Sequence, residues 1–154
     1  MKHKISTGVL IFKSDKILLV KHVDPDTGFT WWVPPGGGIK EDESIYDAAK
    51  REVLEEAGLE ANIGRIVYLR QMIYKKLNSN ILTLYLLSNS VKGELTTNNL
   101  DDKDLDSKYI KEVRYFSRDE IQNIIVFPEI LKDRIWEDYK KGFGEIQFIG
   151  IATD

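Results

Sequence analysis

The feature that most constrains the fold is a run of proline and glycine followed by a sharply bounded helix. The run, residues 34–38, is predicted to continue neither a strand nor a helix. Ser44 and Asp47 have the spacing of a capping box at a helix start, and Gly58 suits the left-handed position that ends a helix. The sequence therefore predicts a helix over residues 45–57.

Three carboxylates crowd one face of this helix. Glu52, Glu55 and Glu56 are three and four residues apart, so they fall within an arc of about 100°. They also lie in the last two turns, where the negative end of the helix dipole disfavours an anion by roughly 0.3–1 kcal/mol. An arbitrary run of glutamates is usually a solvated surface, but a cluster that breaks these local rules favours a compensating cation.

A divalent cation with oxygen ligands is the simplest partner for this cluster. Carboxylates suit hard ions such as Mg²⁺, and the chain has no cysteine, nor any histidine near the helix, to favour zinc. We therefore predict Mg²⁺, with Mn²⁺ as the alternative. Arg51 precedes Glu55 by four residues, so we expect it to pair with that carboxylate and orient it, which leaves Glu52 and Glu56 freer for metal.

The whole segment from residue 37 to residue 59 resembles the signature of the Nudix hydrolase family. The matching positions are Gly37, Glu43, Arg51, Glu52, Val53, Glu55, Glu56, Gly58 and Leu59. Weaker similarities precede it at Trp32-x-x-Pro35-Gly36-Gly37 and follow it at residues 112–120. The resemblance implies one Nudix hydrolase domain over residues 1–154, with an α/β fold in which a mixed β-sheet is flanked by helices as an α/β/α sandwich.

The resemblance also implies roles for individual residues. Glu52, Glu55 and Glu56 would bind or position the metal, and the backbone carbonyl of Gly36 would be a further ligand. Glu52 would act as general base, with Arg51 and Glu55 beside it in the catalytic group. The structural positions of the box would be Gly37, Glu43 and Gly58.

A further acidic residue from outside the box often joins such sites, at a position that varies between members of the family. Glu112, just before a predicted strand, is the first candidate. Asp104, in an acidic loop over residues 98–108, is the second. A solvated carboxylate is the ordinary alternative for both residues.

Aromatic and basic residues outside the box are candidates for contacts with the substrate. Trp31 and Trp32 lie on opposite faces if their segment is extended, so we expect one in the core and the other free to stack on a nucleobase. Tyr74 and Lys75 lie where some Nudix subfamilies place a substrate-selecting residue. A solvated strand end is the alternative for that second pair.

These residues predict hydrolysis of a pyrophosphate bond in a nucleoside diphosphate linked to another moiety. The substrate would be a nucleoside triphosphate, a nucleotide sugar, ADP-ribose or a dinucleoside polyphosphate. A metal neutralises the anionic phosphoryl groups, a carboxylate takes the proton of the attacking water, and water attacks phosphorus. The alternatives are a non-catalytic nucleotide sensor or regulatory binding module of the same fold, and an acidic interaction domain with an idle box.

Composition narrows the class of protein. The chain of 154 residues, 42% hydrophobic and 31% charged, is typical of one soluble globular domain. Its net charge of -3 argues against duplex nucleic acid as a partner, which leaves a small nucleotide derivative. The chain has no run of about 18 apolar residues, so the sequence predicts no membrane span. We expect a cytoplasmic protein. The sequence leaves the oligomeric state open, and a homodimer in which the apolar tail, residues 146–151, takes part is one alternative.

Other elements follow from hydrophobic periodicity and turn residues. Residues 5–12 and 17–23 are predicted to form a hairpin, and residues 63–74 and 81–87 a second strand pair connected by residues 78–80. The remaining predictions are a short extended segment over residues 29–33, a strand over residues 113–116, helices over residues 117–125 and from Pro128 to Gly142, and an edge strand over residues 146–151.

Overall fold

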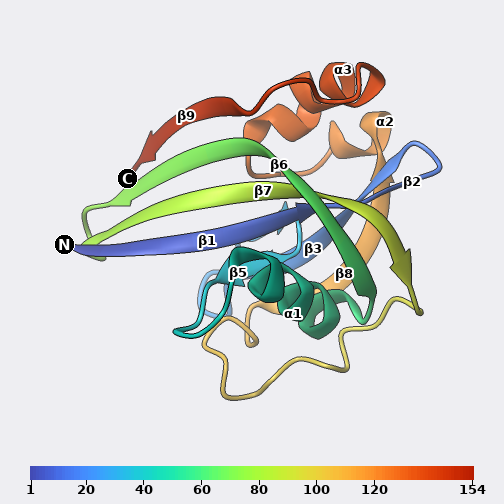
Figure 1. Cartoon of the computed structure of the whole chain (residues 1–154). Helices are drawn as coiled ribbons and strands as arrows, with labels where there is room; N and C mark the ends of the chain where they lie inside the picture. Colours follow the sequence, from blue (N-terminus) through green and yellow to red (C-terminus); the bar gives the residue numbers. More distant parts are fainter.

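The computed structural model describes all 154 residues. Its strands are β1 (Lys2–Leu10), β2 (Phe12–Lys13), β3 (Lys16–Val23), β4 (Thr30–Val33), β5 (Gly36–Gly38), β6 (Glu60–Tyr74), β7 (Ser79–Lys92), β8 (Ile110–Ser117) and β9 (Gln147–Thr153). Its helices are α1 (Ile45–Ala57), α2 (Arg118–Ile121), the 3₁₀ helix η1 (Glu129–Lys132) and α3 (Arg134–Lys140). Figure 1 shows their arrangement.

The strands form two sheets. The larger is mixed, in the order β5-β1-β7-β6-β9, with β1 parallel to β7 and β6 parallel to β9. The smaller contains β2, β3 and β4, and β8 pairs with β3. The predicted edge strand is confirmed, because β9 lies at the edge of the larger sheet. The chain thus has the predicted α/β fold, with its strands divided between two sheets.

Helices cover the strands from opposite sides (Figure 1). The helix α1 packs against β1, β5 and β6 over one apolar cluster: Val9, Ile11, Leu18, Ala49, Val53, Ala57, Leu59, Ala61 and Leu86. The C-terminal helices pack over a second cluster, which includes Leu10, Ile17, Leu19, Tyr68, Phe116, Ile121, Leu131, Ile135 and Trp136. Flanking helices were predicted, and the two clusters confirm them. No helix is long and apolar enough to cross a membrane.

The strand β3 explains why the two cores are separate. Its residues 17–20 are fully buried, and alternate side chains of a strand point to opposite faces. Ile17 and Leu19 belong to the cluster under the C-terminal helices, whereas Leu18 belongs to the cluster under α1. Both faces of this strand are therefore covered.

The first hairpin is shorter than predicted. Only β2 pairs with β3, through Phe12 with Ile17 and Lys13 with Lys16, because β1 continues into the larger sheet beside β7. The proline and glycine run does end β4 at Val33, as predicted, but residues 36–38 then form β5, which was not predicted and which pairs with β1 in the other sheet. Glycine makes this pairing possible: a Cβ at Gly36 would overlap the Thr7 carbonyl oxygen.

The long strands and the C-terminal helices differ from their predicted bounds. Residues 79 and 80 belong to β7, so the turn after β6 lies earlier than expected. The first C-terminal helix stops at Ile121. The second, predicted to run from Pro128 to Gly142, is divided at Asp133, whose φ of -141° and ψ of -78° are not helical.

Candidate active site

The helix α1 is positioned by its two caps. The Ser44 hydroxyl accepts a hydrogen bond from the Asp47 N–H, and the Asp47 carboxylate accepts one from the Ser44 N–H. At the other end Gly58 has a φ of 75° and donates its N–H to the Leu54 carbonyl. Because the apolar face of α1 packs on β1 and β6, its acidic face is turned toward β5. The predicted helix bounds and caps are confirmed.

Two of the clustered glutamates are buried against β5. Glu52 is 7% exposed and Glu56 is 5% exposed. The Gly36 N–H donates a hydrogen bond of 2.7 Å to Glu56 Oε1, and a Cβ at Gly37 would overlap the Glu52 carboxylate. The glycine at position 37 therefore allows the backbone of β5 to approach the Glu52 carboxylate of α1. Metal ligation by the Gly36 carbonyl stays a prediction.

Arg51 is the centre of an ion-pair network. Its guanidinium donates two hydrogen bonds to Glu43, of 2.7 and 2.9 Å, in bidentate geometry. It also donates to Glu52 Oε1 at 2.9 Å and to Glu55 Oε2 at 3.2 Å. A further hydrogen bond of 3.1 Å reaches the Gly38 carbonyl. The predicted pairing of Arg51 with Glu55 is confirmed, and the network extends to two carboxylates that the spacing argument did not assign to Arg51.

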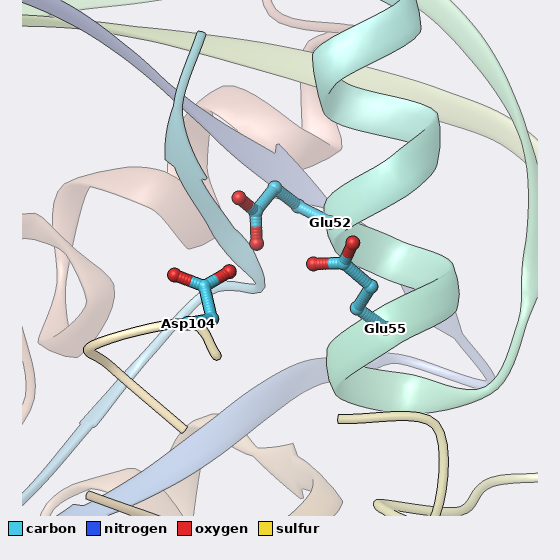
Figure 2. Close-up of side chains that lie close together, drawn as sticks. All are labelled: Glu52, Glu55 and Asp104. Atoms are coloured by element: carbon cyan, nitrogen blue, oxygen red, sulfur yellow. The ribbon is translucent and has the colours of Figure 1, made fainter. Parts of the chain in front are cut away.

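A carboxylate from a distant loop completes the acidic cluster. Glu52, Glu55 and Asp104 point toward one another (Figure 2), with one oxygen of each within 4.8 Å of the others. Glu112, the first candidate from the sequence, lies on β8 with its carboxylate 3.9 Å from both Lys21 and Arg114. The fold thus brings the second candidate into the cluster and pairs the first with surface cations.

Burial and like charge shift the pKa values in this cluster. Burial raises the pKa of Glu52 to about 7, although the bond from Arg51 opposes the shift. Burial, followed by repulsion from Glu52, raises the pKa of Glu56 well above its usual range. Arg51 lowers the pKa of the partly buried carboxyl of Glu43. One guanidinium therefore faces more negative charge than it can neutralise, and this donor set fits a divalent cation.

A cavity of about 680 Å³ opens beside the cluster. Gly36 and Gly37 line it and so connect it to Glu52 and Glu56. Trp31 lines this cavity, whereas Trp32 is 4% exposed and packs edge-on against Phe116 with ring centroids 4.6 Å apart. Trp31 is thus the tryptophan that can contact a ligand in the cavity, and its ring already stacks with those of His22 and Phe29. The predicted substrate contact of Trp32 is wrong, because its ring belongs to the core.

Of the second predicted pair, Tyr74 and Lys75, only one residue lines the cavity. Tyr74 lines the cavity. Lys75 does not line it, and its backbone N–H donates a hydrogen bond of 2.8 Å to the carboxylate of Asp154, so its substrate contact stays a prediction. Arg70 was not among the candidates, yet it lines the cavity. Its signal in the sequence was its even spacing from Tyr74 along one predicted strand, which places both side chains on the same face.

Known proteins share both the sequence pattern and the fold. A rat diphosphoinositol polyphosphate phosphohydrolase 2 is 42% identical over 68 residues, which cover 42% of this chain and 36% of the rat protein. The match thus spans little more than a third of that relative. A NUDIX hydrolase structure from Nitrosomonas europaea aligns with a TM-score of 0.75 and 24% identity over 94% of this chain and 93% of the other.

A further structure, an ADP-ribose pyrophosphatase from Streptococcus suis, aligns with a TM-score of 0.61 and 22% identity, covering 96% of this chain and 98% of the other. These low identities establish the fold alone. The sequence model of the NUDIX domain family, however, matches residues 2–137, and this range includes every residue of the acidic cluster. The chain is therefore a member of the NUDIX domain family.

Proposed function

We propose that this protein hydrolyses a pyrophosphate bond in a nucleoside diphosphate linked to another moiety, with Mg²⁺ as cofactor and Mn²⁺ as an alternative. The observation that carries the proposal is the convergence of Glu52, Glu55 and Asp104 within 4.8 Å. The adjoining cavity, at about 680 Å³, has the size of a small-molecule site. Membership of the NUDIX domain family supports the same reaction class.

The residues that would hold the metal are Glu52, Glu55, Glu56 and Asp104. A bound divalent cation would neutralise phosphoryl charge and make a water molecule more acidic. Oxygen-only ligands suit this ion, and a bound cation would offset the unfavourable position of the carboxylates near the C-terminal end of the helix. We assign to Asp104 the role of the outside carboxylate, for which Glu112 was the first candidate, because Asp104 lies in the cluster with Glu52 and Glu55.

The protein's own groups orient the carboxylates and move the proton. Arg51 donates to both Glu52 and Glu55, so it fixes their directions. Glu52 has a pKa of about 7, and a general base works best when its pKa lies near the working pH. Glu52 is therefore the group we assign to accept the proton of the attacking water. Glu56 fixes β5 through the Gly36 N–H.

Kinetics on purified protein with Mg²⁺ test this proposal. The substrates are a panel of nucleoside triphosphates, nucleotide sugars, ADP-ribose and dinucleoside polyphosphates, with release of phosphate or nucleotide as the readout. We expect Glu52→Gln and Glu55→Gln to lower kcat by about 100-fold or more, because each removes a charged ligand or base. Glu60→Gln, at an exposed position on β6, is the matched control and should leave kcat unchanged.

Two results would contradict the proposal. Full activity in both variants would remove the acidic cluster from the mechanism. Saturable nucleotide binding without turnover of any substrate would favour the non-catalytic sensor instead.

A further inference from the structure

Arg70 is a buried cation whose nearest carboxylate is exposed and too distant for a hydrogen bond. Its side chain is nine-tenths buried and lines the cavity beside the acidic cluster. A guanidinium has five N–H donors. One of them donates to the Met72 sulfur at 3.2 Å, another is shared with the Tyr85 hydroxyl, and the nearest carboxylate, that of Glu129, is 3.9 Å away and 77% exposed. Both partners that it contacts are uncharged. Burying a charge is costly unless it is paired, so the free donors favour an acceptor supplied from the cavity.

The walls of the cavity favour a flat aromatic ligand. Trp31 stacks on Phe29 with ring centroids 5.6 Å apart. The rings of Tyr74, Tyr85 and Phe127 also line the cavity. Aromatic side chains stack on any nucleobase, whichever base it is. A base placed among them would have its edge within the same cavity as the guanidinium of Arg70.

The charges of the cavity disfavour a polyanion. Arg70 is the one cation of its lining, against the carboxylates of Asp24, Glu129 and Asp154. Recognition of several phosphate groups calls for clustered arginine or lysine side chains. A polyphosphorylated inositol, the kind of compound in the name of the rat relative, would enter a cavity whose lining carries net negative charge. A neutral base is the better match.

We propose that Arg70 determines the specificity of this site by binding the acceptor edge of guanine. This inference rests on the proposed function. Guanine presents two neighbouring acceptors, O6 and N7, which an arginine binds in bidentate geometry. Adenine places an amino donor where guanine has O6, so it would set donor against donor at Arg70. The substrate is then a guanosine diphosphate derivative, with its diphosphate at the acidic cluster.

Matched nucleotides test this inference on the wild-type protein. GTP, 7-deaza-GTP and ATP differ at the base edge and carry the same triphosphate. We expect kcat/KM with Mg²⁺ to be at least about tenfold higher for GTP than for ATP, and several-fold higher for GTP than for 7-deaza-GTP, which lacks the N7 acceptor. ADP-ribose and diphosphoinositol pentakisphosphate complete the panel, and preferred turnover of either would overturn the inference.

Variants then connect the preference to Arg70. In Arg70→Met both ratios should fall to about one, and in Arg70→Lys the charge should remain while the preference over 7-deaza-GTP is lost. Arg118→Met is the matched control, because Arg118 forms a surface ion pair with Glu137 outside the cavity. Unchanged base preference in folded Arg70→Met would assign recognition to another group. If Arg70→Met does not fold, the wild-type nucleotide ratios still decide the question.

The two proposals fail in different ways. Absence of turnover for every nucleotide would overturn the proposed hydrolysis, while equilibrium binding of GTP, 7-deaza-GTP and ATP would still test Arg70. Turnover of GTP and ATP with equal kcat/KM would leave the hydrolysis in place and overturn the guanine preference.

Discussion

Individual carboxylates in this protein have different roles because they meet different partners. Glu43 has the bidentate hydrogen bonds of Arg51, whereas Glu52 is buried and shares that guanidinium with Glu55. Asp104 has no cation in its cluster other than Arg51. Residue type alone therefore does not set function. The number of donors and the degree of burial decide which carboxylate is suited to accept a proton and which one holds the network in place.

Asp104 and Glu112 offer a direct comparison at this scale. Asp104→Asn removes one charge from the cluster with Glu52 and Glu55, so we expect kcat/KM to fall by about tenfold or more and the Mg²⁺ concentration for half-maximal activity to rise. Glu112→Gln removes only long surface contacts with Lys21 and Arg114 and should change kcat/KM by less than about twofold. Steady-state kinetics across Mg²⁺ concentrations would check both, and the reverse order would return Glu112 to the site.

At the scale of elements, the packing of α1 against β5 builds the site. The caps fix the ends of α1, and its apolar face fixes its rotation over β1 and β6. Gly37 then lets the strand approach Glu52 of the helix, and Gly36 lets it approach β1. Sequence reasoning predicted α1 correctly because caps and periodicity are local. It missed β5, because pairing with β1 depends on a strand about 30 residues away.

Alanine substitutions at two glycines of β5 distinguish the effect of close packing on stability from the effect of reduced backbone flexibility. In Gly36→Ala the new Cβ would overlap the Thr7 carbonyl oxygen, so we expect a loss of about 2–3 kcal/mol in the free energy of unfolding. In Gly38→Ala the new Cβ meets no atom within 4 Å, and the change should stay within about 0.5 kcal/mol. Denaturant unfolding of both variants measures the difference, and equal losses would argue against the close approach of β1 and β5.

At the scale of the whole molecule, the acidic cluster couples stability to pH and to metal. The pKa of Glu52 is about 7 in the folded state and 4.5 ordinarily. The folded state therefore holds that proton more tightly, and the resulting stability is complete below pH 4.5 and is lost as pH rises through 7. Glu56, whose pKa is also raised, acts in the same direction. Glu43, whose pKa is lowered, acts oppositely and only at lower pH.

The metal-free protein should accordingly lose up to about 3 kcal/mol of unfolding free energy between pH 4.5 and pH 7.5 through Glu52. Saturating Mg²⁺ should restore stability, and its effect on Tm should grow with pH across the same window. Thermal unfolding in EDTA and in Mg²⁺ measures both effects, with Glu52→Gln as the control that flattens the metal-free profile. A wild-type profile no steeper than that of Glu52→Gln would contradict the raised pKa.

The sequence by itself determined the helix, its caps, the placement of Glu52, Glu55 and Glu56 on one face, and the pairing of Arg51 with Glu55. These features depend on residues within a few positions of one another, where helix geometry and side-chain capping fix the outcome. The fold class and the family followed from the same segment.

The tertiary structure alone decided which distant residues join that segment. It brought Asp104 into the cluster instead of Glu112, placed Trp31 in the cavity and Trp32 in the core, and buried Arg70 facing the cavity. Those outcomes depend on the register between strands and on the path of a long loop. Spacing along the chain does not encode either of them, because both are set by packing between segments far apart in sequence.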